Sequence, residues 1–374
     1  MDLSPTPRQQ ELRIGLNAFL ASPPSTGPDV RPLSQPGDDT ALWSDLVAGG
    51  WVTAGFPEAY GGRGGGVGDL VVIAETLGEG HVPTPFHGAI VLCGQALLAA
   101  GEGDRLRALL SGEHTFTYCN WEGFEEPAER PSTVEATKSA QGWRLDGLAR
   151  FVPHGAEADV LLVMAGVRLG GDRATPTLFA VPGSSAGLTT ERVPTVGGDR
   201  CSHVGFSEVE VDVAQVVGEV GGATQWLQRV LAVGRVVLAA EMVGAAAAAL
   251  AHATHWATTR VQFNAPIGSF QAVQHRLADA YIDVVTAQDS VYDAAGIIDR
   301  GEEDRVAAAA AAAKAYCSEA CRRVTAAAHQ VCGGEGIYAD QPLHLWHRRV
   351  AALVPVLGSV RFLRAAVAAS VLPD

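Results

Sequence analysis

The spacing of apolar residues changes twice along the 374-residue chain. In the first part, apolar residues follow helical spacing in segments such as DLVVIAETLG and AIVLCGQALLAA. The second part has short apolar runs separated by turn residues, such as ADVLLVMAGV and TLFAVPG, which is typical of strands. Helical spacing then returns and continues to the end. We therefore predict an α+β multidomain protein with a helical domain over residues 1–113, a β-domain over 114–220 and a C-terminal helical bundle over 221–374.

Four helical segments are predicted in the third part. The first ends near Thr259, and the others span about 269–299, 302–331 and 342 to the end. In the second of these segments the apolar side chains fall on one stripe, as an antiparallel four-helix bundle requires. The stripe consists of Phe270, Val273, Leu277, Tyr281, Val284 and Val291.

Composition excludes several classes of function. The chain is 47% apolar and 18% charged with a net charge of −14, so it lacks the basic field that drives nucleic-acid binding. The N-terminus lacks the basic start and apolar run of a secretory signal, and we expect no membrane-spanning segment and a cytoplasmic location. Six cysteines show no zinc spacing, and His344 and His347 lack a third ligand, so no metal site is expected.

Two glycine-rich segments suggest a nucleotide site, but neither GGRGGGVGD nor GGEGIYAD has the flanking strand and helix of a Rossmann or P-loop motif. The second segment lies one turn after Gln330, and its Gly333 and Gly334 would let a ligand approach the backbone. Arg260, in RVQFNAPIG, adds a fork of donors suited to phosphate oxygens. These residues could bind a pyrophosphate and an adenosine, or they could simply end two helices, and spacing alone leaves both interpretations open.

Several segments, taken together, resemble the acyl-CoA dehydrogenase family. They are GFPEAYGGRG, LFAVPGSSAGLTTERV, VGFSEVEV, TTRVQFNAPIGSFQAVQHRLADAY and QVCGGEGIYADQPL, and they span nearly the whole chain in the family's order. The resemblance implies a helical N-terminal domain, a β-barrel-like middle domain and a C-terminal four-helix bundle, assembled as a dimer of dimers. It also implies FAD bound across a subunit interface. Matched by position, the resemblance implies that one subunit extends six residues to the FAD of its neighbour: Arg260, Gln262, Phe263, Gln330, Gly333 and Gly334.

The family's reaction needs a carboxylate, which removes a proton next to a thioester carbonyl while a hydride leaves the β-carbon for the flavin. The family places this carboxylate either just before the final helix or on the first long bundle helix, beside an arginine. In this sequence the two positions hold Leu357 and Gly234, the latter beside Arg235. Neither residue can accept a proton.

The flavin pocket that this chain would build for itself also departs from the family pattern. Trp121 stands where the family has a threonine, and Pro153 stands where a hydroxyl would reach the flavin. Proline offers neither an N–H nor a hydroxyl. The residues offered to a neighbour's FAD are therefore kept, while the base and the chain's own flavin contacts are replaced.

Three hypotheses follow. The first is a subunit of a hetero-oligomeric, FAD-dependent acyl-thioester dehydrogenase, an α2β2 assembly in which a homologous partner supplies the base. The second is a homomeric flavoenzyme with a relocated base, for which Glu241, two helical turns from Gly234, is the candidate. The third is a family fold recruited to a non-redox task, such as a lyase, a cyclase or a scaffold. The substrate of the first two is an acyl thioester of coenzyme A or of a carrier protein.

Overall fold

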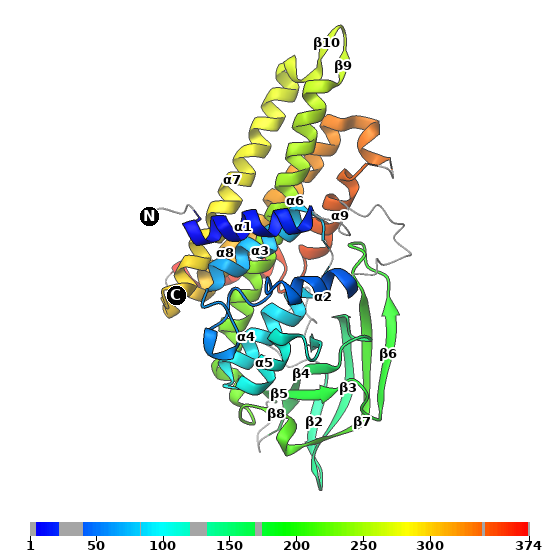
Figure 1. Cartoon of the computed structure of the whole chain (residues 1–374), viewed down its shortest axis with the longest axis vertical. Helices are drawn as coiled ribbons and strands as arrows, with labels where there is room; N and C mark the ends of the chain where they lie inside the picture. Colours follow the sequence, from blue (N-terminus) through cyan, green and yellow to red (C-terminus); the bar gives the residue numbers. More distant parts are fainter. Residues whose placement is uncertain are drawn as a thin grey trace.

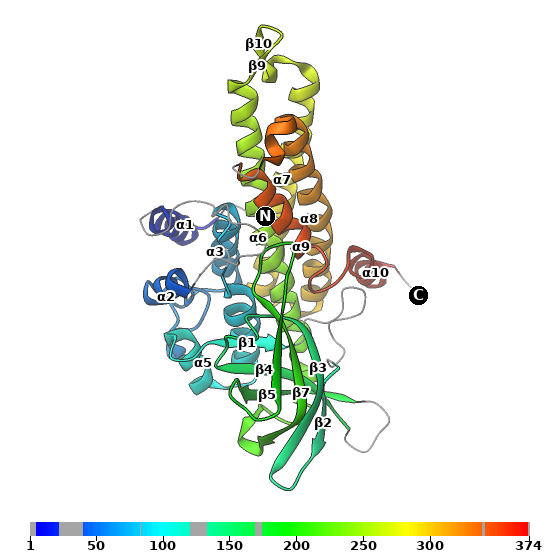
Figure 2. The same cartoon turned by 90° about the vertical axis from the view of Figure 1, so that its right-hand side faces the viewer.

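The computed structural model describes residues 5–21, 40–82, 84–119, 133–168, 174–338 and 341–372. Figures 1 and 2 show a group of N-terminal helices and a β-sheet beside the lower half of a long helical bundle. The predicted fold class is confirmed: along the chain, a helical first part is followed by a sheet-containing middle part and a helical third part.

The N-terminal part is helical. Its helices are α1 (Pro7–Leu20), α2 (Thr40–Ala48), α3 (Val67–Glu79), α4 (Gly94–Ala99) and α5 (Gly103–Ser111), with a π-helical segment η2 (Phe86–Cys93) directly before α4. Short 3₁₀ turns elsewhere in the chain are η1 (Glu58–Tyr60), η3 (Val213–Gln215), η4 (Gly222–Gln225), η5 (Ile267–Ser269) and η6 (Gly333–Ile337).

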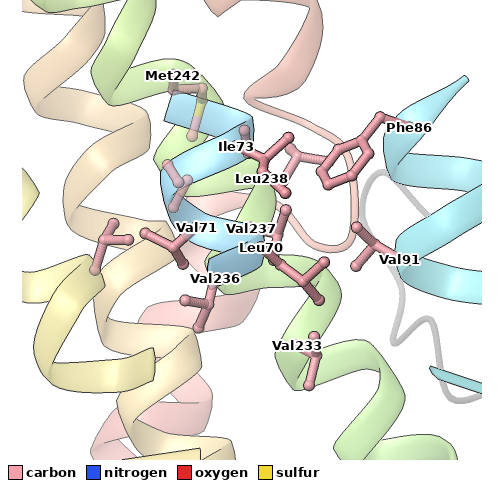
Figure 3. Packing of buried hydrophobic residues seen from close by; sticks show 14 of the residues in the cluster. Leu70, Val71, Ile73, Phe86, Val91, Val233, Val236, Val237, Leu238 and Met242 are labelled. Carbon is pink, nitrogen blue, oxygen red and sulfur yellow. The ribbon is translucent and has the colours of Figure 1, made fainter. Parts of the chain in front are cut away.

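Helix α3 is buried against α6 (Leu227–Thr259), and Figure 3 shows the apolar side chains between them. Two glycines allow the close approach. A Cβ on Gly78 would lie 2.1 Å from the carbonyl oxygen of Glu241, and a Cβ on Gly244 would lie 1.9 Å from that of Glu75. Any larger residue at either position would force the two helices apart.

The middle part is a mixed, mainly antiparallel sheet. Its strands are β1 (Phe116–Cys119), β2 (Glu135–Lys138), β3 (Gly142–Pro153), β4 (Val160–Val167), β5 (Thr175–Pro182), β6 (Leu188–Val193), β7 (Cys201–Asp212) and β8 (Val216–Val217). The strand order is β6-β7-β3-β2-β4-β5-β8, and β1 pairs parallel to β4.

The near-alternation predicted in β7 is confirmed. Val204, Phe206, Val209 and Val211 are buried and belong to the core of the sheet. The break in the alternation is a bulge, because Phe206 pairs with Gly147 whereas Val209 pairs with Leu145, so β7 has one extra residue there. The bulge includes Glu208 in the left-handed region (φ 50°).

The C-terminal part contains α6, α7 (Gln271–Asp299), α8 (Glu303–Cys332), α9 (Leu343–Leu353) and α10 (Val360–Val371). The prediction of one helix from residue 342 to the end is wrong, because a connection at residues 354–359 divides it into α9 and α10. Pro355 cannot donate a helical backbone hydrogen bond. Leu357 (φ 59°) and Gly358 (φ 123°) then turn the chain out of helical geometry.

The predicted apolar stripe of α7 is only partly buried. Val291 lies in the core, but Tyr281 is 64% exposed and Phe270 is also exposed. Val273, Leu277 and Val284 are half-buried against the core, whereas Phe270 and Tyr281 lie at the surface. The helical period therefore predicted the helix correctly, but it did not predict which of the apolar side chains are exposed.

Helix α6 is long and apolar enough to span a membrane by length and composition. Residues 242–259 within it carry no Asp, Glu, Lys or Arg, which corrects the expectation that the chain has no such stretch. Its apolar window is 94% buried inside the protein, between α3, α7, α8 and α9. A core helix passes the same test, so this helix is weak evidence for a membrane.

Candidate active site

The two positions at which the family carries its base lie side by side. A Cβ built on Gly234 of α6 would lie 2.8 Å from Cδ1 of Leu357, in the connection between α9 and α10, and 2.7 Å from Cδ2 of Leu92. Leu357 is only 4% exposed. Its side chain therefore occupies the space that a side chain at Gly234 would need. Two positions 123 residues apart in sequence form one place in the fold, and neither supplies a carboxylate.

Two buried basic side chains, Arg235 and Lys314, hold the connection that carries Leu357. Arg235 Nε donates to the carbonyl oxygen of Leu357 at 2.9 Å. Lys314 Nζ, fully buried in α8, donates to the carbonyls of Leu353 and Val354 at 3.2 and 3.0 Å and to Ser318 Oγ at 3.1 Å. Burial lowers the pKa of Lys314 to about 7. These bonds tie carbonyls at and beyond the last turn of α9 to side chains of α6 and α8.

His87, on η2, is a buried titratable residue at this place that the sequence reasoning missed. Its ring Nε2 lies 2.9 Å from the carbonyl oxygen of Gly234. A carbonyl can only accept, so Nε2 carries the proton. Burial lowers the pKa of His87 to about 4, and the ring is neutral near pH 7. A lone histidine in the apolar run HGAIVLC was the only signal in the sequence, and π-helical segments are frequent at functional sites.

A cavity of about 300 Å³ opens beside His87 where the three parts of the chain meet. Its walls come from the start of η2, the end of β3, the connection between β6 and β7, α6, and α9 with the residues that follow it. The polar lining residues are Thr84, His87, His154, Thr195, Asp199 and Arg349, and the remaining lining is apolar or glycine.

Pro153, which the resemblance places at the family's flavin position, lines this cavity. Its carbonyl accepts from Thr117 Oγ1 at 2.5 Å, and it presents no donor. Phe151 and His154, on either side, both have positive φ (51° and 54°), and such backbone strain persists only where surrounding contacts hold it. Trp121 lies outside the described residues.

Glu241 does not face this place as a free carboxylate. Its Oε1 accepts from Arg349 Nε at 2.5 Å, and Arg349 Nη1 also bonds Asp199 Oδ1. Burial alone would raise the pKa of Asp199, but the neighbouring guanidinium outweighs burial and lowers it. The ion pair with Arg349 already occupies this carboxylate, which disfavours Glu241 as a general base.

Arg260, Gln262 and Phe263 lie on and beside a hairpin formed by β9 (Val261–Gln262) and β10 (Ala265–Pro266), which projects beyond the end of the bundle (Figure 1). Phe263 and Asn264 both have positive φ (52° and 62°), the geometry of a two-residue type I′ turn. Arg260 caps α6, and its guanidinium lies 5.7 Å from the ring of Trp256. Arg260 and Gln262 are exposed, and Phe263 is 90% exposed, so all three side chains point away from the chain's own core.

Gln330, Gly333 and Gly334 lie together at the end of α8. Gln330 is exposed and lines a groove of about 820 Å³ between α7 and α8. Gly333 ends the helix with φ 61°, and a Cβ on either glycine would meet nothing within 4 Å. The glycines thus end a helix and also leave its last turn open to an approaching group. Within the described residues, no hydrogen bond or ring contact joins this set to the hairpin.

The remaining histidines and cysteines have structural environments. No group of three potential metal ligands occurs among the described residues. His347 Nδ1 lies 3.0 Å from Thr325 Oγ1, and His344 Nδ1 lies 3.4 Å from Arg348 Nη1. All six cysteines are free and buried, as predicted.

Comparison with known proteins identifies the class. Residues 6–112 match the model of the acyl-CoA dehydrogenase N-terminal domain, and residues 221–372 match that of the C-terminal domain. The acyl-CoA dehydrogenase FadE27 of Mycobacterium tuberculosis is 31% identical over 319 residues, covering 82% of this chain and 81% of that protein.

Two solved structures are similar over the full length of both chains. The ChsE4-ChsE5 complex from Mycobacterium tuberculosis gives a TM-score of 0.85 at 27% identity. The butyryl-CoA dehydrogenase from Megasphaera elsdenii gives 0.91 at 26%. Fold and matches define an oxidoreductase of the acyl-CoA dehydrogenase type. The chain belongs to the acyl-CoA dehydrogenase family, and the resemblance inferred from its sequence is confirmed.

The contact between Gly234 and Leu357 can be tested by stability. We expect Gly234→Ala to lower the free energy of unfolding by about 1–3 kcal/mol, because the new methyl overlaps Leu92 and Leu357. Leu357→Ala should create room for it, so in chemical denaturation of the full chain the double variant should be more stable than the two single effects predict. Additive effects would mean that the two residues do not share one space.

Proposed function

We propose that this chain is the subunit of a hetero-oligomeric acyl-thioester dehydrogenase that lacks the base and lends its FAD-binding residues to a partner's active site. The observation that carries the proposal is the contact between Leu357 and Gly234. It leaves no carboxylate at either of the family's base positions and fills the space in which one would sit.

FAD is the cofactor that the exposed residues fit. Arg260 offers a planar fork of donors for pyrophosphate oxygens, and no ion pair with the described residues competes for it. Gln330 and the open backbone at Gly333 and Gly334 suit an adenosine. The glycines also end α8, and that role requires no ligand. The chain's own cavity fits the flavin ring less well, because Pro153 offers it no donor. When bound, the flavin accepts the hydride that leaves the β-carbon.

A homologous partner subunit is supported by the exposed apolar side chains at this end of the bundle. They are Val261, Phe263 and Phe270 at the hairpin, Tyr281 and Ile282 on α7, and Ile337 and Tyr338 after α8. Large exposed apolar side chains of this kind mark protein interfaces. The similar ChsE4-ChsE5 structure is a complex, and we infer an α2β2 assembly for this chain and a partner that carries the glutamate.

The flavin content of the assembly tests the proposal. Each interface contains two potential sites, and only the one that combines the partner's pocket with this chain's Arg260 is complete. We therefore expect two FAD per α2β2 tetramer, counted by absorbance against protein concentration on a complex whose mass is known from light scattering.

Two other outcomes would replace the proposal. Four flavins per tetramer, or a stable and active homotetramer of this chain alone, would favour a homomeric enzyme with a relocated base. Absence of flavin reduction with every acyl thioester offered to the complex would favour a non-redox task.

Restoring a carboxylate to this chain should not be enough to make it an enzyme. We expect Leu357→Glu to give no acyl-CoA-dependent bleaching of flavin in the isolated chain, because Pro153 leaves a flavin ring without a donor on that side. Leu357→Gln is the matched control for the change in shape and polarity. Bleaching by the glutamate variant and not by the glutamine variant would show that the pocket can hold flavin by itself.

A further inference from the structure

The 300 Å³ cavity persists although this chain lacks the base that would use it. A cavity of about 150 Å³ accepts benzene, so this one has room for a medium-length aliphatic group. Apolar side chains such as Leu238 and Val356 form most of its wall, and they lose packing contacts when it is empty. A ligand that fills it stabilises the folded chain by mass action.

One charged donor faces this apolar space. Arg349 lines the cavity and is 9% exposed. Its Nε bonds Glu241 and its Nη1 bonds Asp199, while Nη2 makes no hydrogen bond with the described residues. A buried guanidinium with an unused donor at the wall of an apolar cavity is suited to an acceptor oxygen on a ligand.

The charges around Arg349 decide what kind of oxygen fits. One guanidinium and two carboxylates leave the cluster with a single net negative charge. A ligand carboxylate would be repelled at this end of the cavity, whereas a ketone or ester-like carbonyl keeps the hydrogen bond without adding charge. His87, which also lines the cavity, is neutral and adds no positive charge near pH 7.

We propose that this cavity is a non-catalytic binding site for a neutral, largely apolar molecule whose carbonyl oxygen accepts from Arg349. The inference goes beyond the proposed function, since binding here requires neither flavin nor a partner's base. Two sources share this chemistry: the acyl part of a thioester that carries a second carbonyl, and a free ketone. Because the chain has no carboxylate at Leu357 or Gly234, the bound molecule is held without being oxidised.

The test uses three eight-carbon probes on the full chain, in complex with its partner where the complex is the stable form. Calorimetric titration and the shift in melting temperature are measured with octan-2-one, octane and octanoate. We expect octan-2-one to bind about tenfold more tightly than octane, since a hydrogen bond to a charged donor has that effect. Octanoate should bind more weakly than the ketone. Failure of octan-2-one to bind, or equal binding of ketone and octanoate, would overturn the proposal.

Two variants separate the cavity from the rest of the protein. Val356→Phe fills the cavity and should abolish ketone binding. Ala48 lines a different cavity of about 370 Å³, so Ala48→Phe should leave ketone binding unchanged. Asp199→Asn retains an oxygen for Arg349 and removes the net charge, so it should raise the affinity for octanoate at least severalfold relative to the ketone. Ketone binding that survives Val356→Phe, or an unchanged preference in Asp199→Asn, would place the ligand elsewhere.

Competition identifies the source. Displacement of octan-2-one by a 3-oxo-octanoyl thioester of pantetheine indicates an acyl thioester, and lack of displacement indicates a free neutral ligand; both outcomes keep the site. None of these measurements depends on flavin content. The proposed function could therefore fail on FAD counting while this site stands, and the reverse is equally possible.

Discussion

Arg260→Ala in the assembled complex should remove most dehydrogenase activity, although the proposed assembly places the base for that activity on the other chain. Hydrogen bonds to charged groups contribute about 1.5–3 kcal/mol each, so losing a bidentate contact with the pyrophosphate should weaken FAD binding by roughly 100-fold or more. Arg260 is exposed at the end of α6, and its guanidinium lies over the ring of Trp256 on the protein surface. The fold should therefore tolerate the change to alanine.

The measurement is flavin occupancy and turnover of the purified complex, with added FAD titrated back. The variant should regain part of its activity at high FAD, because the alanine lowers affinity rather than damaging the base. Arg361→Ala is the matched control, since Arg361 is an exposed arginine on α10, away from the hairpin (Figure 2). Full flavin occupancy and unchanged FAD affinity in Arg260→Ala would rule out a role for this arginine in binding the cofactor.

The same contact predicts which flavin is bound. FMN lacks the diphosphate and adenosine that Arg260 and Gln330 would address, so the complex should retain FAD and release FMN on dialysis. An equal affinity for FMN would show that the exposed residues at this end of the bundle serve the partner surface and not the cofactor.

Local patterns predicted most of the fold because the period of apolar residues reports directly on secondary structure. Alternation in β7 and helical spacing in α6, α7 and α8 were sufficient. The break between α9 and α10 was missed because Ala, Val and Leu continue the helical pattern through Pro355, and only the positive φ of Leu357 and Gly358 reveals the turn. The exposure of Phe270 and Tyr281 was missed for a different reason: the sequence shows an apolar stripe but not whether its cover comes from the same chain.

The candidate site could be predicted only where position in the family pattern carried the information. Leu357 and Gly234 were each identified, but their contact depends on how α6 packs against the connection after α9, which no local pattern encodes. The ion pairs of Glu241 were likewise unpredictable, because Arg349 and Asp199 lie 108 and 42 residues away from it in sequence. His87 was missed since burial, and not residue type, makes it notable.

That buried cluster should also control stability. Arg349→Met should lower the free energy of unfolding by about 3–5 kcal/mol, because it leaves the carboxylates of Asp199 and Glu241 buried without their cation. Asp199 lies in the β-domain, Glu241 on α6 and Arg349 on α9, so the loss should loosen the junction at which these elements meet. Arg348→Met is the matched control, since this more exposed neighbour donates to the carbonyl of Val196 and pairs with no carboxylate in the described chain.

As the pH falls into the acid range, the contribution of Asp199 to folding stability should change in opposite directions in the wild type and in Arg349→Met. In the wild type the pKa of Asp199 is depressed, so its stabilising contribution is fully present above the unfolded value of about 3.9 and is lost as the pH falls through the folded value. In Arg349→Met, burial without the cation favours the protonated carboxyl and raises the folded pKa above the unfolded one. The variant should therefore regain stability relative to the wild type as the pH falls from 7 toward 4, in denaturant titrations at each pH.

The triple variant Arg349→Met, Asp199→Asn, Glu241→Gln removes both buried charges that Arg349→Met leaves unpaired, and it should recover much of the lost stability at pH 7. If Arg349→Met were as stable as Arg348→Met, and its stability changed with pH as that of the wild type does, water would reach these carboxylates. The cluster would then not hold the three elements together.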